Sequence, residues 1–135
     1  MVFNRFFPET ATKVNKNTPD SINEAIQRKI ADNIRLFKEK DKAEIKKRLE
    51  ELDFEWDTER VLETNLAIIT LLSSIYGLTK NRAWMLISGT ASVFMIQHAL
   101  QGWCPPLSLI RKLGIRTAEE IDQEKDALNH LLSAK

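Results

Sequence analysis

The only cysteine of the chain, Cys104, stands where a helix must break, between Trp103 and two consecutive prolines. Proline has no backbone N–H to donate, so Pro105 and Pro106 end any helix that precedes them. An exposed thiol at such a break could accept a persulfide and relay sulfur to or from a partner enzyme. A buried thiol would instead be a small apolar side chain. Both interpretations stay open, but a single cysteine excludes an internal disulfide and a multi-cysteine zinc site.

Three further residues form a candidate polar network at the edges of an apolar stretch. Arg60 and Glu63 lie one helical turn apart, and we expect them to pair with each other or with the turn after Pro106. His98 has no second histidine or carboxylate at metal-ligand spacing, so a hydrogen-bonded interface histidine is expected. The chain has no glycine-rich phosphate loop, no metal-ligand cluster and no serine–base arrangement. The sequence therefore predicts no catalytic residue, no metal, no cofactor and no enzyme.

The elements that position these residues follow from the distribution of charge. Residues 64–110 carry only two formal charges, Lys80 and Arg82, while the flanking segments are densely charged. Two apolar runs of membrane-relevant length lie on either side of this basic turn, and the first run is at the short end of the spanning range. We therefore predict a transmembrane helical hairpin over residues 61–110. Aromatic residues mark both of its ends, as interfacial belts do: Tyr76, Trp84 and Trp103.

Small and polar side chains predict which sides of the two membrane helices meet. No proline or glycine interrupts residues 41–76, so one helix could run from water into lipid. Along that helix the contact side changes from apolar to small or hydroxylated, because helices in lipid associate through small residues and hydrogen bonds. The predicted helix–helix interface comprises Ala67, Thr70, Ser74, Gly77, Thr90, Gln97 and Gln101.

The flanking segments complete an all-α prediction, with amphipathic cytoplasmic helices before and after the hairpin. Residues 1–17 are expected to be a flexible amino-terminal segment. Residues 18–60 show apolar side chains every three or four positions and predict a helical hairpin that begins with Thr18 as N-cap. Residues 111–135 predict a final helix, opened by a capping box between Thr117 and Glu120. A soluble core that hosts the apolar hairpin remains an alternative.

The charge balance bears on partners and orientation. Twenty basic and nineteen acidic residues leave a formal net charge of +1, so the overall charge does not predict a protein that binds nucleic acid. The apolar run at the amino terminus is too short for a signal peptide.

The basic residues near the hairpin predict its orientation. Arg111 and Lys112 mark the return to water after the hairpin. Together with the basic residues before the hairpin, they outnumber the two basic residues of the turn. The positive-inside rule therefore predicts that both termini lie in the cytoplasm.

Two short motifs after the hairpin resemble the YgaP-like inner-membrane domain family. Gly102, Cys104 and Pro105 resemble the family's Gly-x-Cys-Pro segment, and residues 114–117 its Gly-Ile-x-Thr segment. Residues 15–18 and 55–65 resemble a longer stand-alone subgroup with an amino-terminal helical extension. The resemblance implies a bacterial two-helix membrane hairpin that can pair as a homodimer. Some members are fused to a rhodanese domain. This sequence contains no segment that resembles the catalytic loop of a rhodanese, so the resemblance does not imply sulfurtransferase activity.

These observations leave three classes of function. The first is a non-catalytic module of the bacterial inner membrane that contacts the lipid bilayer. Such a module would self-associate as a homodimer or join a larger membrane protein complex. The second is a sulfur or redox relay that uses Cys104 with a separate sulfurtransferase. The third is a soluble helical oligomer whose apolar hairpin is buried between subunits.

Overall fold

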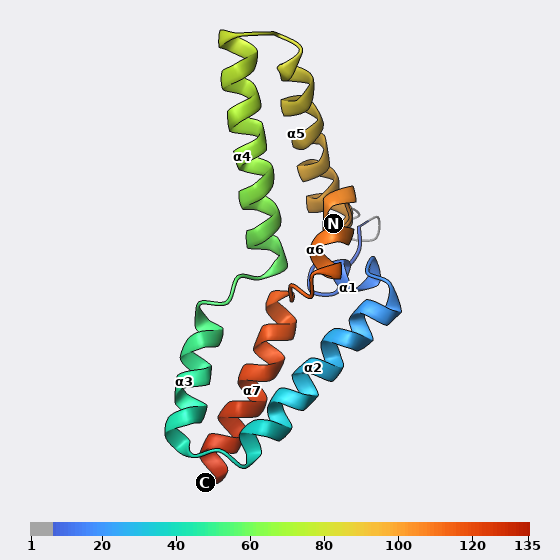
Figure 1. The fold of residues 1–135 in the computed structure, drawn as a ribbon. Coiled ribbons are helices and arrows are strands. Elements are labelled where there is room, and N and C mark those ends of the chain that lie inside the picture. The colour runs from blue at the N-terminus through green and yellow to red at the C-terminus, as the bar shows by residue number, and fades with distance from the viewer. Residues whose placement is uncertain (1–6) are drawn as a thin grey trace, which may run out of the picture.

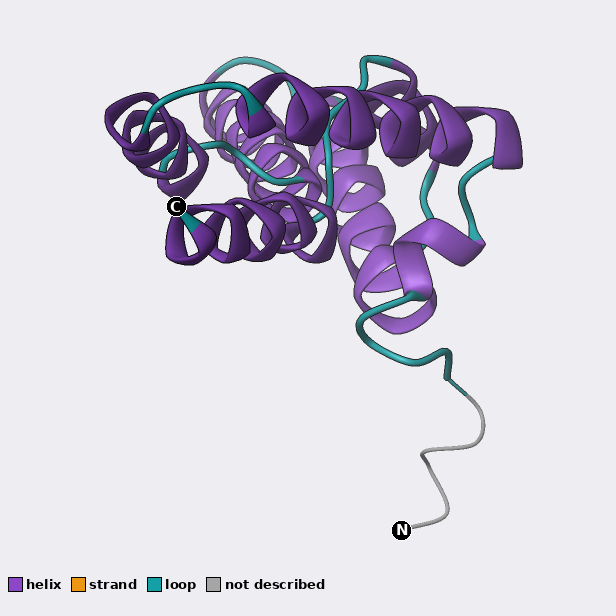
Figure 2. Cartoon of the chain, turned by 90° about the horizontal axis from the view of Figure 1, so that it is seen from below, coloured by secondary structure: helices purple, strands orange, loops and turns teal. Residues whose placement is uncertain are grey.

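The computed structural model describes residues 7–135, and within that range every regular element is a helix. The prediction of an all-α fold is confirmed. The elements, in chain order, are α1 Lys13–Lys16, α2 Asp20–Lys38, α3 Lys42–Asp53, α4 Thr58–Thr79, α5 Trp84–Gln101, α6 Pro105–Lys112 and α7 Ala118–Ala134. Seen along its length, the molecule has an isolated helical pair at one end and three packed helices at the other (Figure 1). Seen from below, the described chain consists of helices joined by loops (Figure 2).

Helices α4 and α5 form an antiparallel pair that projects away from the rest of the chain (Figure 1). The 22 residues of α4 extend over about 33 Å at 1.5 Å per residue. The Asp57 side chain caps the start of α4 by accepting from the Arg60 N–H at 2.9 Å. At the far end, the rings of Tyr76 and Trp84 lie 5.4 Å apart on either side of the connecting turn. The apolar runs and the basic turn therefore fold into a helical hairpin.

One segment of the described chain, within Lys42–Thr79, is long and apolar enough to cross a membrane, judged by length and composition only. The expected uninterrupted helix over residues 41–76 is wrong, because α3 ends at Asp53 and α4 begins at Thr58. The break places the apolar segment in α4. Helix α5 has 18 residues but does not meet the same criterion, because polar side chains of glutamine and histidine lie in its last turns.

Helices α2, α3 and α7 pack together into a unit that we call the three-helix unit. Its core consists of Ile45, Leu52, Ile121 and Leu128, all nearly inaccessible to solvent. The predicted capping box at the start of α7 is present, with both Thr117 and Glu120 in their expected roles. Helix α2 begins one residue later than predicted, since Pro19 takes the cap position and the Thr18 hydroxyl donates to the Val14 carbonyl at 2.8 Å.

Between the hairpin and the three-helix unit lies a waist, formed by α1, α6 and the base of α4 and α5 (Figure 1). A second apolar cluster fills it, comprising Val14, Leu62, Leu66, Ala91, Cys104, Leu107 and Ile110. The expected flexible segment 1–17 falls partly outside the described residues. Its last part differs from the expectation, because α1 is helical and Val14 is buried in this cluster.

Candidate functional site

The hairpin carries an unusually large exposed apolar surface. Fourteen large apolar or aromatic side chains of α4 and α5 are exposed: Ile68, Ile69, Leu71, Leu72, Ile75, Tyr76, Leu78, Trp84, Met85, Leu86, Ile87, Val93, Ile96 and Leu100. They point away from the α4–α5 contact on more than one side. Soluble monomers rarely expose a contiguous apolar area of this size. The surface is therefore suited to contact with another apolar phase or chain.

Six hydroxyl groups along the hairpin are hydrogen-bonded within the hairpin itself. Four of them donate to a carbonyl one turn earlier in their own helix, at 2.6–2.9 Å: Ser73 to Ile69, Thr79 to Ile75, Thr90 to Leu86 and Ser92 to Ser88. Ser74 and Ser88 share a hydrogen bond of 2.8 Å between the two helices. Hydrocarbon offers no hydrogen-bonding partner, so a helix in lipid must satisfy its polar groups internally. These hydroxyls meet that requirement.

The contact between α4 and α5 includes part of the predicted helix–helix interface. Gly77 is buried, and a Cβ atom added there would lie 2.6 Å from the Sδ atom and 3.2 Å from the backbone nitrogen of Met85, so any larger residue would have to displace Met85. Ser74 takes part through its bond to Ser88. Thr70 and Gln97 are half-buried, whereas Ala67, Thr90 and Gln101 are exposed. Ser88 and Ala91 were not among the predicted interface residues, yet both are buried at the contact.

The polar network at the hairpin base differs from the predicted one. His98 is buried, and its Nε2 atom lies 2.7 Å from a Glu59 carboxylate oxygen. The Lys13 Nζ atom lies 3.6 Å from the other oxygen of Glu59. The Arg60 guanidinium instead stacks 5.3 Å from the Trp56 ring centroid, and Glu63 is exposed with no ion pair among the described residues. The expected pairing of Arg60 with Glu63 therefore does not form.

Cys104 is fully buried in the apolar cluster of the waist. It occupies the cap position of α6, and Pro105 follows at the first helical position, where its missing N–H costs nothing. Two residues earlier, Gly102 ends α5 in the left-handed conformation with φ 72°. A Cβ atom added to Gly102 would lie 2.5 Å from the Lys13 Cβ atom. The Gly-x-Cys-Pro segment thus has a structural role, ending one helix and starting the next.

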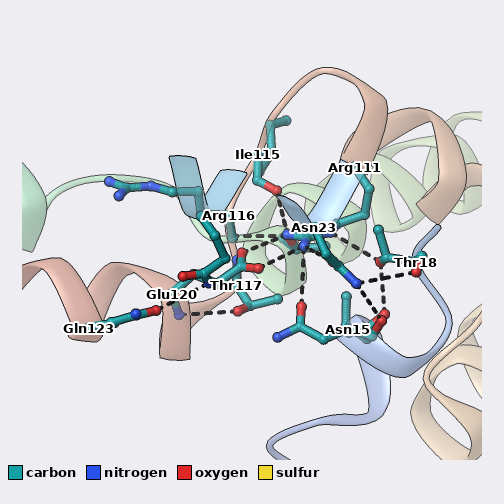
Figure 3. Close-up of polar contacts among 12 residues, drawn as sticks. Asn15, Thr18, Asn23, Arg111, Ile115, Arg116, Thr117, Glu120 and Gln123 are labelled. Atoms are coloured by element: carbon teal, nitrogen blue, oxygen red, sulfur yellow. Dashed lines mark hydrogen bonds and ion pairs between the residues drawn. The ribbon is translucent and has the colours of Figure 1, made fainter. Parts of the chain in front are cut away.

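Arg111, near the end of α6, was expected to mark the aqueous boundary. It is instead buried on the inner side of that helix, with 1% exposure. Its guanidinium forms a fork with the Glu120 carboxylate, at 2.7 and 2.8 Å (Figure 3). Its remaining donor capacity is directed at four other oxygen atoms, on Asn15, Thr18, Asn23 and the Ile115 carbonyl. A buried charge is tolerated only when it is paired and hydrogen-bonded in this way.

A second buried arginine, Arg116, links the waist to the three-helix unit. It donates to Glu55, in the α3–α4 connection, and to Glu124 on α7. Glu124 is fully buried and also accepts from Asn33 and Arg48. Burial alone would raise the pKa of Glu124, but these hydrogen bonds together hold it below its usual 4.5. Burial likewise opposes the charge of Arg116, yet its hydrogen bonds to the two carboxylates raise its pKa.

The start of α4 is tied to the same region through backbone groups. The Thr58 N–H donates to the Arg116 carbonyl at 2.8 Å, and the Thr58 hydroxyl lies within hydrogen-bond distance of the Ile115 and Arg116 carbonyls. Hairpin and three-helix unit are thus connected by a hydrogen-bonded joint rather than by a loose linker.

An open recess of about 800 Å³ lies beside this joint, between α1, the base of α4 and the start of α7. Acidic side chains dominate its lining: Glu59, Glu63, Glu119, Asp122 and Asp126. Within the described residues, no group of three histidine, cysteine or acidic residues is placed to hold a metal ion. The recess is therefore acidic, but its described residues do not form a metal-ion site.

No protein-family model, no curated protein and no solved structure matches this chain.

Proposed function

We propose that this chain is a non-catalytic membrane module. In this account α4 and α5 lie in a bilayer, while the three-helix unit lies on its cytoplasmic side. The observation that carries the proposal is the exposure of large apolar side chains along α4 and α5, joined to hydroxyls that are satisfied within the hairpin. Lipid would cover this surface, and burial of a leucine-sized side chain contributes about 1.5–3 kcal/mol.

The distribution of basic residues supports the cytoplasmic orientation. The turn between α4 and α5 offers only Lys80 and Arg82, whereas exposed lysines and arginines are more numerous on the three-helix unit. Positive loops stay in the cytoplasm, so the turn would face outward. Burial of Arg111 and Arg116 removes two charges from this count, because each is neutralised by a carboxylate.

Self-association would use one side of the hairpin. The predicted interface residues Ala67, Thr70 and Ser74 line an apolar groove of about 580 Å³ beside the α4–α5 contact. The rest of its lining consists of Leu66, Leu71, Ser92, Met95 and Ile96. Small residues allow the backbones of two membrane helices to approach closely, so in this proposal a helix of a second copy packs against this groove. We propose the homodimer, alone or within a larger membrane assembly, on this basis.

The alternative sulfur relay is disfavoured by the burial of Cys104, since a sulfur acceptor must be reached by its partner. A soluble oligomer would need protein partners over most of the hairpin surface. The likeness to YgaP-like hairpins remains part of the proposal and rests on the residues around Cys104.

Alkaline extraction of membranes from expressing cells tests the proposal. We expect the chain to stay in the pellet after washing at high pH. Leu72→Arg places a charge on the exposed side of α4, which costs about 2.5–3.5 kcal/mol at the centre of a membrane helix, and should weaken retention. Asn129→Arg, on the exposed side of α7, is the matched control and should not. Recovery of the native chain in the soluble fraction would overturn the proposal in favour of a soluble oligomer.

A further inference from the structure

Exposed apolar side chains also occur outside the hairpin, and they gather at the waist. Among the described residues beyond α4 and α5, seven large apolar or aromatic side chains are exposed. Five of them lie in the waist or in the α3–α4 connection beside it, and we call these five the waist rim: Phe54, Trp56, Trp103, Leu109 and Leu113. By contrast, the helices of the three-helix unit expose only Leu36. The rim is therefore a local feature and not a general property of the surface.

The rim lies on both sides of the hairpin base. Phe54 and Trp56 belong to the α3–α4 connection, which approaches the base from one side (Figure 1). Leu109 lies on α6, and Leu113 follows directly, on the other side (Figure 1). A single protein partner would cover one of these sides, whereas a planar phase that surrounds the hairpin reaches both.

Helix α6 buries apolar residues on its inner side and also exposes apolar residues on its outer side. Its inner side is buried, with Leu107 and Ile110 in the apolar cluster and Arg111 in the polar joint. Its outer side presents Leu109, and Leu113 just beyond its end is 72% exposed. Because the inner apolar side is occupied by the protein's own cluster, only Leu109 and Leu113 are available to insert at the boundary between headgroups and acyl chains.

Basic side chains accompany the rim. Lys112 is exposed between Leu109 and Leu113, and the Arg60 guanidinium stacks on Trp56. Lysine and arginine keep their charge in the headgroup layer while their stems cover apolar surface. Tryptophan prefers the same layer.

We infer that the waist rim is a membrane-surface docking site, seated in the headgroup layer of the leaflet from which the hairpin enters. This inference rests on the proposed function, because the rim continues the apolar surface of the hairpin. The occupant is the lipid headgroup and upper acyl region. Docking on two sides fixes the depth of the hairpin and holds the three-helix unit against the membrane surface.

Spin labels in lipid nanodiscs test the inference. The chain would carry Cys104→Ala and one added cysteine, in turn Phe54→Cys, Leu109→Cys, Ala31→Cys or Ile75→Cys. Each nitroxide is then exposed to oxygen, which concentrates in lipid, and to a water-soluble nickel chelate. Ala31 is exposed on α2 and reports the aqueous phase, and Ile75 reports the hydrocarbon. Nanodiscs leave both membrane faces open to the chelate, and discs with one copy exclude contact between copies. A thermal melt of each variant confirms that it folds.

At both rim positions we expect a several-fold loss of chelate collisions relative to Ala31, and a smaller oxygen signal than at Ile75. Rim labels that behave like Ala31, while Ile75 stays inaccessible to the chelate, would overturn the docking site and leave the membrane hairpin standing. Rim protection that appears only with two copies in a disc would also overturn it, in favour of a protein interface. Free access of the chelate to Ile75 would instead refute the proposed function itself.

Discussion

Replacing Arg111 by methionine should destabilise the folded chain strongly. The guanidinium forms a two-point contact with Glu120 and donates to oxygens of α1, α2 and the α6–α7 connection. Its removal leaves the Glu120 carboxylate buried at 2% exposure without its countercharge. Breaking a buried ion pair by removing one partner costs about 3–5 kcal/mol. Arg111→Lys should also be costly, because an ammonium group cannot reproduce the fork.

The contribution of the pair itself is isolated by a double-mutant cycle. Glu120 also accepts from the Thr117 N–H at 2.8 Å, so its loss removes part of the capping box. The double variant Arg111→Met/Glu120→Met should nevertheless cost about 2 kcal/mol less than the sum of its single variants, within the range for directly coupled residues. The solvent-accessible pair Lys40 and Glu44, 3.0 Å apart, serves as control, with a coupling of about 0.2–1 kcal/mol.

Urea unfolding in mild detergent, followed by circular dichroism, measures these free energies. The reasoning would be refuted if Arg111→Met cost less than about 1 kcal/mol, which is the range of a surface substitution. It would also be refuted if the costs in the Arg111–Glu120 cycle were simply additive. Either result would mean that the joint between hairpin and three-helix unit contributes little to stability.

Three further predictions concern single positions. Since the folded pKa of Glu124 is held below 4.5, its contribution to stability should be fully present above that value and should be lost as the pH falls from there through the lower folded pKa. A pH series of unfolding midpoints should therefore be flatter in this acidic range for Glu124→Gln. Gly77→Val should separate α4 from α5 and weaken the hairpin, because an added side chain meets Met85. Gly89→Val is the control and should leave the contact unchanged, because nothing lies within 4 Å of an added Cβ atom. Disulfide trapping between the two helices measures the contact in both variants. Cys104 should resist maleimide labelling until the chain unfolds, and rapid labelling of the folded protein would contradict its burial.

The helical class and the position of the hairpin could be predicted from the sequence because they depend on local patterns. Two charge-poor runs around Lys80 and Arg82 correspond to α4 and α5, and the capping box opens α7 as expected. Such signals act within one or two helical turns.

The break between α3 and α4 could not be predicted because it depends on residues that are far apart in the sequence. Asp57 caps α4 locally, but the connection is also fixed by Glu55, whose partner Arg116 lies 61 positions away. Arg111 was assigned to the aqueous boundary by the same local reasoning. Its partners on α1 and α2 lie 88 to 96 positions earlier, so no spacing rule could reveal them. Pairing between distant charges is decided by the packing of α6 against α4 and the placement of α7.

The choice of partner for His98 shows a further limit. The sequence placed His98 in one candidate network with Arg60 and Glu63 but did not identify its hydrogen-bond partner. The structure selects Glu59, one turn before Glu63 on α4, together with Lys13 from α1. Because α1 was expected to be flexible, neither its lysine nor the tight approach of Gly102 to it could be anticipated.

The central claim, that the α4–α5 hairpin crosses a membrane, is tested most directly by cysteine accessibility in intact cells. The chain would carry Cys104→Ala with Arg82→Cys in the turn, Ile75→Cys in α4 or Ser133→Cys at the end of α7. We predict that a membrane-impermeant maleimide labels Arg82→Cys from outside, Ser133→Cys only after permeabilisation, and Ile75→Cys in neither state. Labelling of all three only after permeabilisation, with the chain recovered in the soluble fraction, would contradict the claim.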